Sequence, residues 1–204
     1  MALSGTEIAT IIAMLGTGKL PYSGGPAASL SPSIAQTIPW EIASTAFAPS
    51  TGVMYLSAIY LNAGQTVKNI NYVTVGAATG PTHLLFALYD DGRSSTSANQ
   101  LGLLAQTADQ GSAAINANTN IGLSLILPYT TSYSGLYYTA FVCAVATTMP
   151  TLQSSGGTSA IGTQISPSAA NFLSMSAGSS LTSSAPNPSG AITSLSTFVY
   201  AYVS

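Results

Sequence analysis

The chain has 204 residues but only three Lys or Arg and five Asp or Glu, so charged residues make up 4% of the sequence, against about 25% in ordinary domains. Three cations are too few for a nucleic-acid-binding surface or a polybasic membrane patch. The mean hydropathy is +0.40, yet no apolar stretch approaches the roughly 20 residues that a membrane-spanning helix needs.

We interpret residues 1–50 as an extended N-terminal arm that carries one short helix. Ser4 and Glu7 are spaced as in a capping box, and apolar residues follow at the spacing of one helix face. Five prolines between residues 21 and 49 then predict an extended path. The helix packs either on its own domain or on a neighbouring subunit. In the second alternative the assembly contacts are Ile8, Ile11, Ile12, Leu15 and Trp40.

Residues 51–204 are expected to form one β-sandwich domain. About eight short strands without alternating helices predict an all-β fold, an antiparallel jelly-roll-like β-sandwich. The run 135–147 has aromatic and small residues on both faces, which predicts a central strand, and Pro128 is expected to end the strand before it. The expected strands are 53–61, 67–75, 83–89, 101–107, 121–127, 135–147 and 192–203, with weaker ones near residues 161 and 172.

Tyrosine is frequent, with 11 copies in the chain. Tyr200 and Tyr202 alternate with apolar residues in the last expected strand, and four more tyrosines lie between residues 129 and 138. We expect most of these rings in the core or in an interface, where the hydroxyl reaches a partner. Exposed rings that stack on sugars are the alternative.

Candidate catalytic or metal-binding residues are scarce. His83 is the only histidine, and no nucleophile-elbow sequence accompanies it, so we expect a structural role. Asp90 and Asp91 are adjacent in a turn sequence, which argues against a glycosidase pair. A calcium site that combines them with Asp109 is an alternative, although three carboxylates are few for binding calcium. Cys143 lies in an apolar run and is expected to be a buried, inert thiol. We therefore predict no catalytic residue, no metal site and no cofactor.

Three segments resemble a known group of proteins. They are residues 82–90 (THLLFALYD), 103–110 (LLAQTADQ) and 128–138 (PYTTSYSGLYY). Together they are similar to the β-sandwich virion structural proteins of actinobacterial phages, a group that includes minor tail, head-fibre and capsid decoration proteins. The resemblance covers roughly residues 53–150, and no catalytic residue comes with it.

The resemblance and the low charge lead to one functional expectation. The chain is expected to be a non-enzymatic phage virion structural protein, a capsid decoration or head-fibre protein that binds the particle as a homotrimer. Its partners would be its own copies and major capsid or tail proteins, with no nucleic acid and no membrane. No basic residue precedes the apolar segment 8–15, so we expect no signal peptide and synthesis in the bacterial cytoplasm.

Two other functions stay open at this point. The first alternative is a minor tail or tail-tip receptor-binding module that grips a host cell-wall glycan. The second is an enzyme such as a cell-wall hydrolase, which the residue inventory disfavours.

Overall fold

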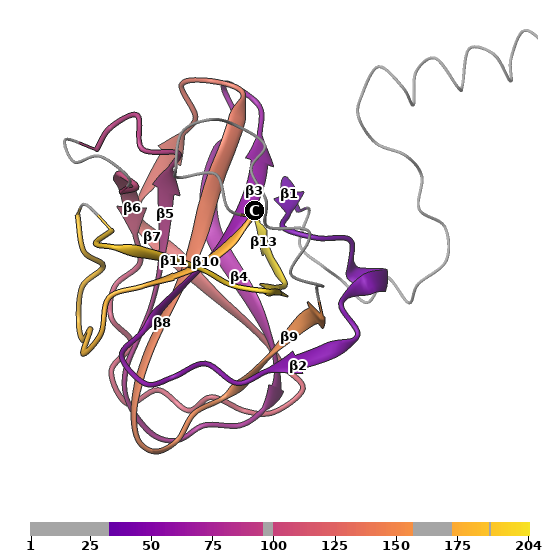
Figure 1. The fold of residues 1–204 in the computed structure, drawn as a ribbon, viewed down its shortest axis with the longest axis vertical. Coiled ribbons are helices and arrows are strands. Elements are labelled where there is room, and N and C mark those ends of the chain that lie inside the picture. Colours follow the sequence, from indigo (N-terminus) through magenta and orange to yellow (C-terminus); the bar gives the residue numbers. More distant parts are fainter. Residues whose placement is uncertain (1–32, 96–99, 157–172, 188) are drawn as a thin grey trace, which may run out of the picture. The chain divides into compact units, whose positions relative to one another are not determined.

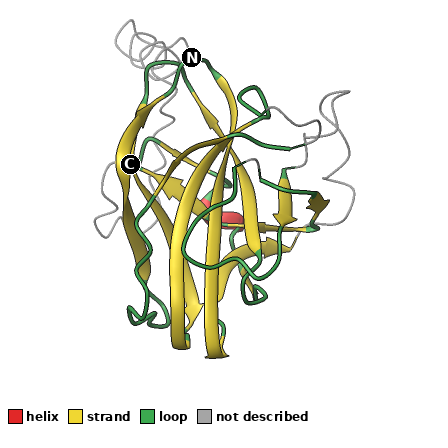
Figure 2. Cartoon of the chain, turned by 90° about the vertical axis from the view of Figure 1, so that its left-hand side faces the viewer, coloured by secondary structure: helices red, strands yellow, loops and turns green. Residues whose placement is uncertain are grey.

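Eight strands, β2 to β9, form two antiparallel sheets that pack face to face (Figures 1 and 2). The computed structural model describes residues 33–95, 100–156, 173–187 and 189–204, which belong to one compact unit. The eight strands are β2 (Thr45–Phe47), β3 (Met54–Leu61), β4 (Thr66–Gly76), β5 (Thr79–Asp90), β6 (Leu103–Gln106), β7 (Asn120–Thr130), β8 (Gly135–Thr148) and β9 (Thr151–Gly156).

The order of these strands defines the topology. One sheet contains β2-β9-β4-β7, and the other contains β3-β8-β5-β6, with every neighbouring pair antiparallel. Successive strands therefore cross between the sheets, except where β5 pairs with β6 as a local hairpin. This is the connectivity of a jelly roll. The predicted all-β, antiparallel jelly-roll-like sandwich is confirmed.

Short strands from the two ends of the described chain enlarge both sheets. β10 and β11 add to the free edge of β3 and complete a six-stranded sheet. β12 pairs with β9, while β13 pairs with β4 on one side and β1 on the other, so the last strands enter where β4 and β9 diverge. The added strands are β1 (Ala35–Gln36), β10 (Ser174–Ala177), β11 (Ile192–Ser194), β12 (Thr197–Val199) and β13 (Ala201–Val203).

The main core lies between the two sheets, because alternate residues of each strand point inward. Its centre is aromatic: the Tyr72 ring meets Phe86 edge to face at 4.7 Å and Phe141 at 5.3 Å between ring centroids. All three rings are fully buried. Cys143 is also buried in this core, as expected, and burial raises the pKa of its thiol to about 12.

The central strands β3, β5 and β8 are buried on both faces. Their outward-facing residues, among them Leu56, Leu85 and Tyr138, form a second cluster with Met175 and Ala185 from the segment after residue 172. This explains why the sequence of β8 is apolar on both faces, as predicted for a central strand. The outer face of the other sheet is covered by residues near the N-terminal end of the described chain, where Ala43 packs with Tyr200 and Tyr202.

The described part of the predicted arm, residues 33–50, belongs to the sandwich. β1 pairs Ala35 with Val203, and β2 pairs Phe47 with Leu152. The Thr37 hydroxyl donates to the carbonyl of Val199 at 3.0 Å. The compact unit therefore begins near residue 32, not at the expected boundary after residue 50. The predicted N-terminal helix and the weak strands near residues 161 and 172 lie outside the described residues.

Pro128 does not end a strand, contrary to the prediction, because β7 continues through it to Thr130. The register jumps here: Tyr129 pairs with Val67, but the next pair is Ser124 with Asn69. Residues 125–128 have no partner on β4: Leu125 is buried and bridges Thr107, while Ile126 and Leu127 are exposed. The backbone N–H of Lys68, opposite this bulge, donates to the carbonyl of Ser204 at 2.8 Å. A proline fits such a bulge because its missing N–H removes no ladder hydrogen bond.

The expected strand 192–203 is divided into β11, β12 and β13, which belong to two different sheets. Its alternation holds at the C-terminal end, where Val199, Ala201 and Val203 face the main core while Tyr200 and Tyr202 face outward.

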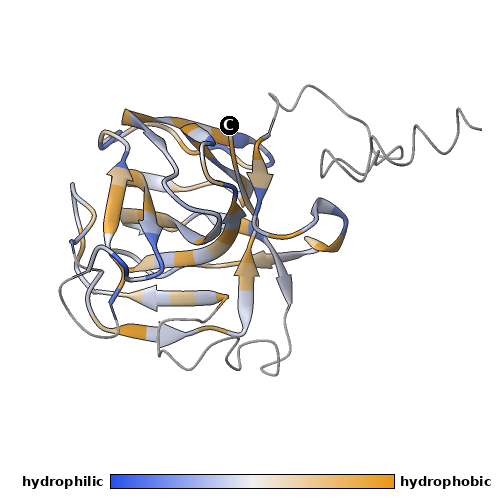
Figure 3. Ribbon diagram, turned by 90° about the horizontal axis from the view of Figure 1, so that it is seen from above, coloured by the Kyte–Doolittle hydropathy of each residue, from blue (hydrophilic) through white to orange (hydrophobic). Residues whose placement is uncertain are grey.

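Strongly hydrophilic positions are few on the strands and loops, as Figure 3 shows. In the described ranges, no helix is long and apolar enough to cross a membrane. The described surface is therefore built from Ser, Thr, Asn, Gln and apolar side chains more than from charges.

Candidate functional site

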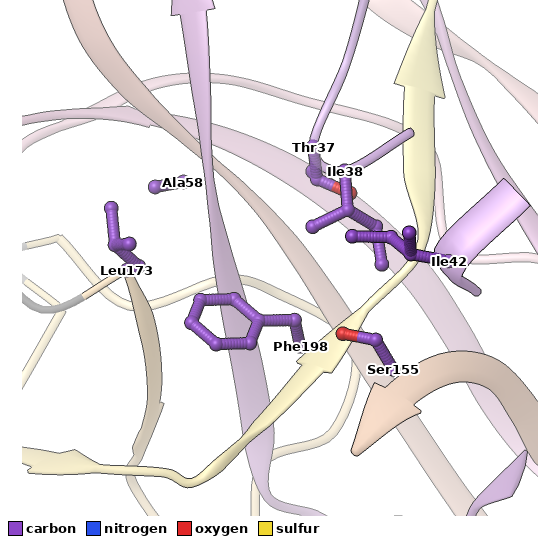
Figure 4. A pocket seen from close by; sticks show the side chains of 7 residues that line it. All are labelled: Thr37, Ile38, Ile42, Ala58, Ser155, Leu173 and Phe198. Carbon is purple, nitrogen blue, oxygen red and sulfur yellow. The ribbon is translucent and has the colours of Figure 1, made fainter. Parts of the chain in front are cut away.

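An apolar pocket of about 160 Å³ lies beside β12, lined by side chains from both sheets (Figure 4). Phe198 of β12 and Ser155 of β9 come from one sheet, while Ala58 of β3 comes from the other. The wall is completed by residues before and within the short 3-10 helix η1 (Trp40–Ile42) and by the residue before β10. The lining residues are Thr37, Ile38, Ile42, Ala58, Ser155, Leu173 and Phe198.

Local hydrogen bonds fix the walls of this pocket. The Thr37 hydroxyl accepts the N–H of Ala201 at 2.9 Å and donates to the Val199 carbonyl at 3.0 Å. On the other side, the N–H of Ala58 donates to the carbonyl of Leu173 at 2.8 Å. The Ser174 hydroxyl, next to the pocket, donates to the carbonyl of Thr197 at 2.5 Å. The pocket is thus held by both sheets.

The chemistry of the lining favours an apolar guest. The pocket contains no charged side chain, and the Thr37 hydroxyl is already engaged in hydrogen bonds. An apolar cavity of about 150 Å³ in a well-studied protein binds benzene. This pocket therefore has room for one aromatic ring or for a branched aliphatic side chain.

The rim of the pocket exposes large apolar side chains. Ile42 is 53% exposed and Trp40, two residues earlier on η1, is 45% exposed. The Trp40 ring meets Tyr200 edge to face at 5.0 Å, which holds the indole in place. Because burying apolar surface is favourable, a partner that covers this rim gains stability.

The structure places one predicted assembly residue next to this pocket, namely Trp40. The other four, Ile8, Ile11, Ile12 and Leu15, lie outside the described residues. Sequence reasoning missed Ile42, Leu173 and Phe198. The sequence gives little indication that these three residues share a pocket, because each belongs to a different short segment.

A second site, which is polar, consists of His83 and Asp109 near the start of β5. The Nδ1 atom of His83 lies 2.6 Å from Oδ2 of Asp109. Oδ1 of the same carboxylate accepts the N–H groups of Leu84 at 3.0 Å and Gly111 at 2.9 Å. Within the described ranges, no hydroxyl or thiol is hydrogen-bonded to His83. The arrangement fastens the loop around Asp109 to β5, and it lacks a positioned nucleophile among the described residues.

The Asp109 pair predicts a pH dependence. Burial opposes ionisation of Asp109, but hydrogen bonds from His83, Gly111 and Leu84 outweigh it and lower the pKa of this carboxyl. A carboxyl whose pKa is lowered in the folded state adds stability above its unfolded pKa of about 4, and this stability is lost as the pH falls through the folded pKa. Asp109→Asn should therefore lower the melting temperature at pH 7 and flatten its decrease below pH 4. Thermal melts from pH 7 to pH 2.5 check this, with Asp91→Asn as control. Parallel curves for the wild type and Asp109→Asn would contradict it.

The three carboxylates of the calcium alternative are held by separate donors. Asp90 accepts the N–H groups of Gly92 and Gly102 on Oδ1, and that of Ser94 on Oδ2. Asp91 pairs with the Arg93 side chain at 3.0 Å. Asp109 is bound to His83, so the three do not converge, and the described residues contain no group of three potential metal ligands.

Most of the tyrosines are internal. Tyr137, Tyr138, Tyr200 and Tyr202 are buried, in line with the expected core or interface positions. Tyr133 stacks on Tyr137 at 4.7 Å, and the Arg93 guanidinium lies 4.1 Å from the centre of the Tyr133 ring. Among the tyrosines that the structure describes, Tyr60 of β3 is exposed, at 58%.

No protein-family model matches the chain, and no curated protein matches it significantly. A functional proposal must therefore rest on the fold, on the apolar pocket and its rim, and on the composition of the surface.

Proposed function

We propose that this chain is a non-enzymatic structural protein of a phage virion, a capsid decoration or head-fibre protein that binds the particle surface as a homotrimer. The observation that carries the proposal is the combination of a jelly-roll sandwich with a charge content of 4%. Net charge near zero promotes association of a free protein. The same property suits a subunit whose neighbours cover much of its surface.

Exposed apolar side chains support an assembly role. They occur in three places of the described chain: on η1, on β3, and in the bulge of β7. In a cyclic oligomer every subunit buries the same patch against its neighbour. One exposed apolar patch per subunit is therefore enough to hold a small oligomer together. The exposed large apolar residues are Trp40, Ile42, Tyr60, Ile126 and Leu127.

The absence of enzymatic activity is part of the proposal. Its support is that Asp109 is bound by His83 and two backbone N–H groups, and that Asp90 is bound by three. Carboxylates that accept several backbone hydrogen bonds in this way hold loops in place. The resemblance to virion structural proteins, for its part, brings no catalytic residue with it.

A second candidate is a minor tail or tail-tip module that binds a host cell-wall glycan. The observation in its favour is the exposed ring of Tyr60 together with the exposed indole of Trp40, since sugars stack on such rings. Replacing both aromatic residues by alanine should then abolish binding on a glycan array. The primary proposal expects no array signal from the wild type.

Antibody labelling of purified particles separates the two candidates. The decoration or head-fibre proposal predicts label over the capsid surface. Label confined to the tail tip would favour the glycan-binding alternative. Particles that carry no label, prepared from cells that contain the protein, would contradict both.

A further inference from the structure

We infer that the apolar pocket beside η1 receives the apolar side chains of residues 8–15 from a second copy of this chain. This inference rests on the proposed homo-oligomer and names the contact that builds it. The contact is heterologous, because the pocket of one subunit meets the N-terminal segment of the next. Repetition of such a contact forms a ring when the rotation between subunits closes, as the proposed homotrimer requires.

The pocket supplies the receiving half of this contact. Its lining is apolar apart from Thr37 and Ser155, and its volume of about 160 Å³ fits one or two aliphatic side chains. Ile42 and Trp40 extend the apolar surface beyond the opening. A guest that fills the pocket therefore contacts Ile42, and a guest that extends past the opening along η1 also covers Trp40.

Residues 8–15 supply the complementary half. Ile8, Ile11, Ile12 and Leu15 are spaced to share one face of a helix, and no charged residue occurs between Glu7 and Lys19. A helix of this length is marginal alone in water, since isolated helices need about 12–15 residues even in favourable sequences. The segment therefore gains from an apolar partner surface.

The charges next to the two halves are complementary. Glu41 lies on η1 beside Ile42, and it is the only charged residue between residues 33 and 67. Lys19, four residues after Leu15, is the only Lys or Arg in residues 1–32. A segment seated on the pocket with its C-terminal end toward η1 brings opposite charges together at the rim.

The chain is long enough to join two subunits in this way. The stretch from Leu15 to Ser33 reaches up to about 60 Å when fully extended. A compact domain of about 170 residues has a radius of gyration of only about 15 Å. The segment of one subunit therefore reaches the pocket of an adjacent subunit.

Complementation between two variants of the full chain tests the inference. Ile42→Asp damages the pocket and leaves the segment intact, while Ile12→Asp damages the segment and leaves the pocket intact. Each variant alone should fall from the oligomer to the monomer mass of 20.5 kDa in light scattering at micromolar concentration. An equimolar mixture should recover a dimer, because the intact segment of the first variant fits the intact pocket of the second.

The controls make every outcome decisive. Ala114→Asp, at an exposed position between β6 and β7 that lies outside the proposed contact, should remain oligomeric, and circular dichroism should show β-structure in all variants. Oligomers that survive both Ile42→Asp and Ile12→Asp, or that are lost with Ala114→Asp instead, would overturn the docking contact while the proposed oligomer stands. Lower melting temperatures without a change of mass would place the segment on its own subunit and overturn the contact between copies. A monomeric wild type would count against the proposed oligomer itself.

Discussion

Replacing Asp90 by alanine is expected to lower the free energy of unfolding by about 3–5 kcal/mol. The carboxylate is 2% exposed and accepts the backbone N–H groups of Gly92, Ser94 and Gly102 at 2.8–3.1 Å. Alanine leaves the buried N–H of Gly102 without an acceptor, which costs about 1–3 kcal/mol. It also removes the hydrogen bonds of half-buried Gly92 and exposed Ser94, which water replaces only in part. Urea denaturation followed by circular dichroism measures the loss.

Two further substitutions separate the hydrogen bonds of Asp90 from its charge. Asp90→Asn keeps an acceptor for Gly92 and Gly102 but directs an amide group at the N–H of Ser94, so its loss should be smaller than that of alanine. Asp91→Asn changes an adjacent carboxylate that pairs with exposed Arg93, and should have little effect. Equal effects of Asp90→Ala and Asp91→Asn would refute the proposed role of Asp90 in holding the loop after β5.

Phe141→Ala is expected to cost about 3–5 kcal/mol, the usual range for removing a buried aromatic ring. The ring is fully buried between the sheets, with Tyr72 at 5.3 Å and Phe86 at 5.7 Å between centroids. Its removal leaves a cavity at the centre of the main core, on the strand that pairs with both β3 and β5. Since small domains have a total stability of about 5–15 kcal/mol, this variant should melt far below the wild type in scanning calorimetry.

The matched control for Phe141 is Tyr60→Ala on β3. Tyr60 is also an aromatic residue of the six-stranded sheet, but it is 58% exposed. Its removal should change the melting temperature only slightly. A loss at Tyr60 as large as that at Phe141 would mean that the Tyr60 ring is buried in an assembly under the conditions of the measurement.

Strands with regular apolar patterns were predictable from the sequence. The apolar faces of β3, β5 and β8 and the alternation of residues 199–203 follow directly from burial of one or both faces. β9 was missed because one of its two buried positions is Ser154 rather than an apolar residue. The Ser154 hydroxyl donates to the carbonyl of Thr45 at 3.1 Å, and this bond replaces the expected apolar contact.

The role of residues 33–50 was not predictable from composition alone. Prolines indicate an extended path, but they do not show whether that path crosses solvent or lies along a sheet. Here Ile34 and Thr37 donate backbone hydrogen bonds to Val203 and Ala201, residues at the far end of the chain.

The pocket could not be foreseen either, because its walls come from five separate segments that only the folded chain brings together. Trp40 is predicted from the sequence to be an assembly contact because it is the single tryptophan, and this stays a prediction. Ile42, on the same short helix, gave no signal in the sequence.

The copy number of this chain in gradient-purified particles shows directly whether it is a structural subunit of a virion, as proposed. Quantitative mass spectrometry with a labelled reference peptide, calibrated on the major capsid protein, gives this number. A decoration or head-fibre protein that binds as a homotrimer is expected in many copies per particle, in a multiple of three. Particles that are complete and infectious but contain none of the protein would contradict it.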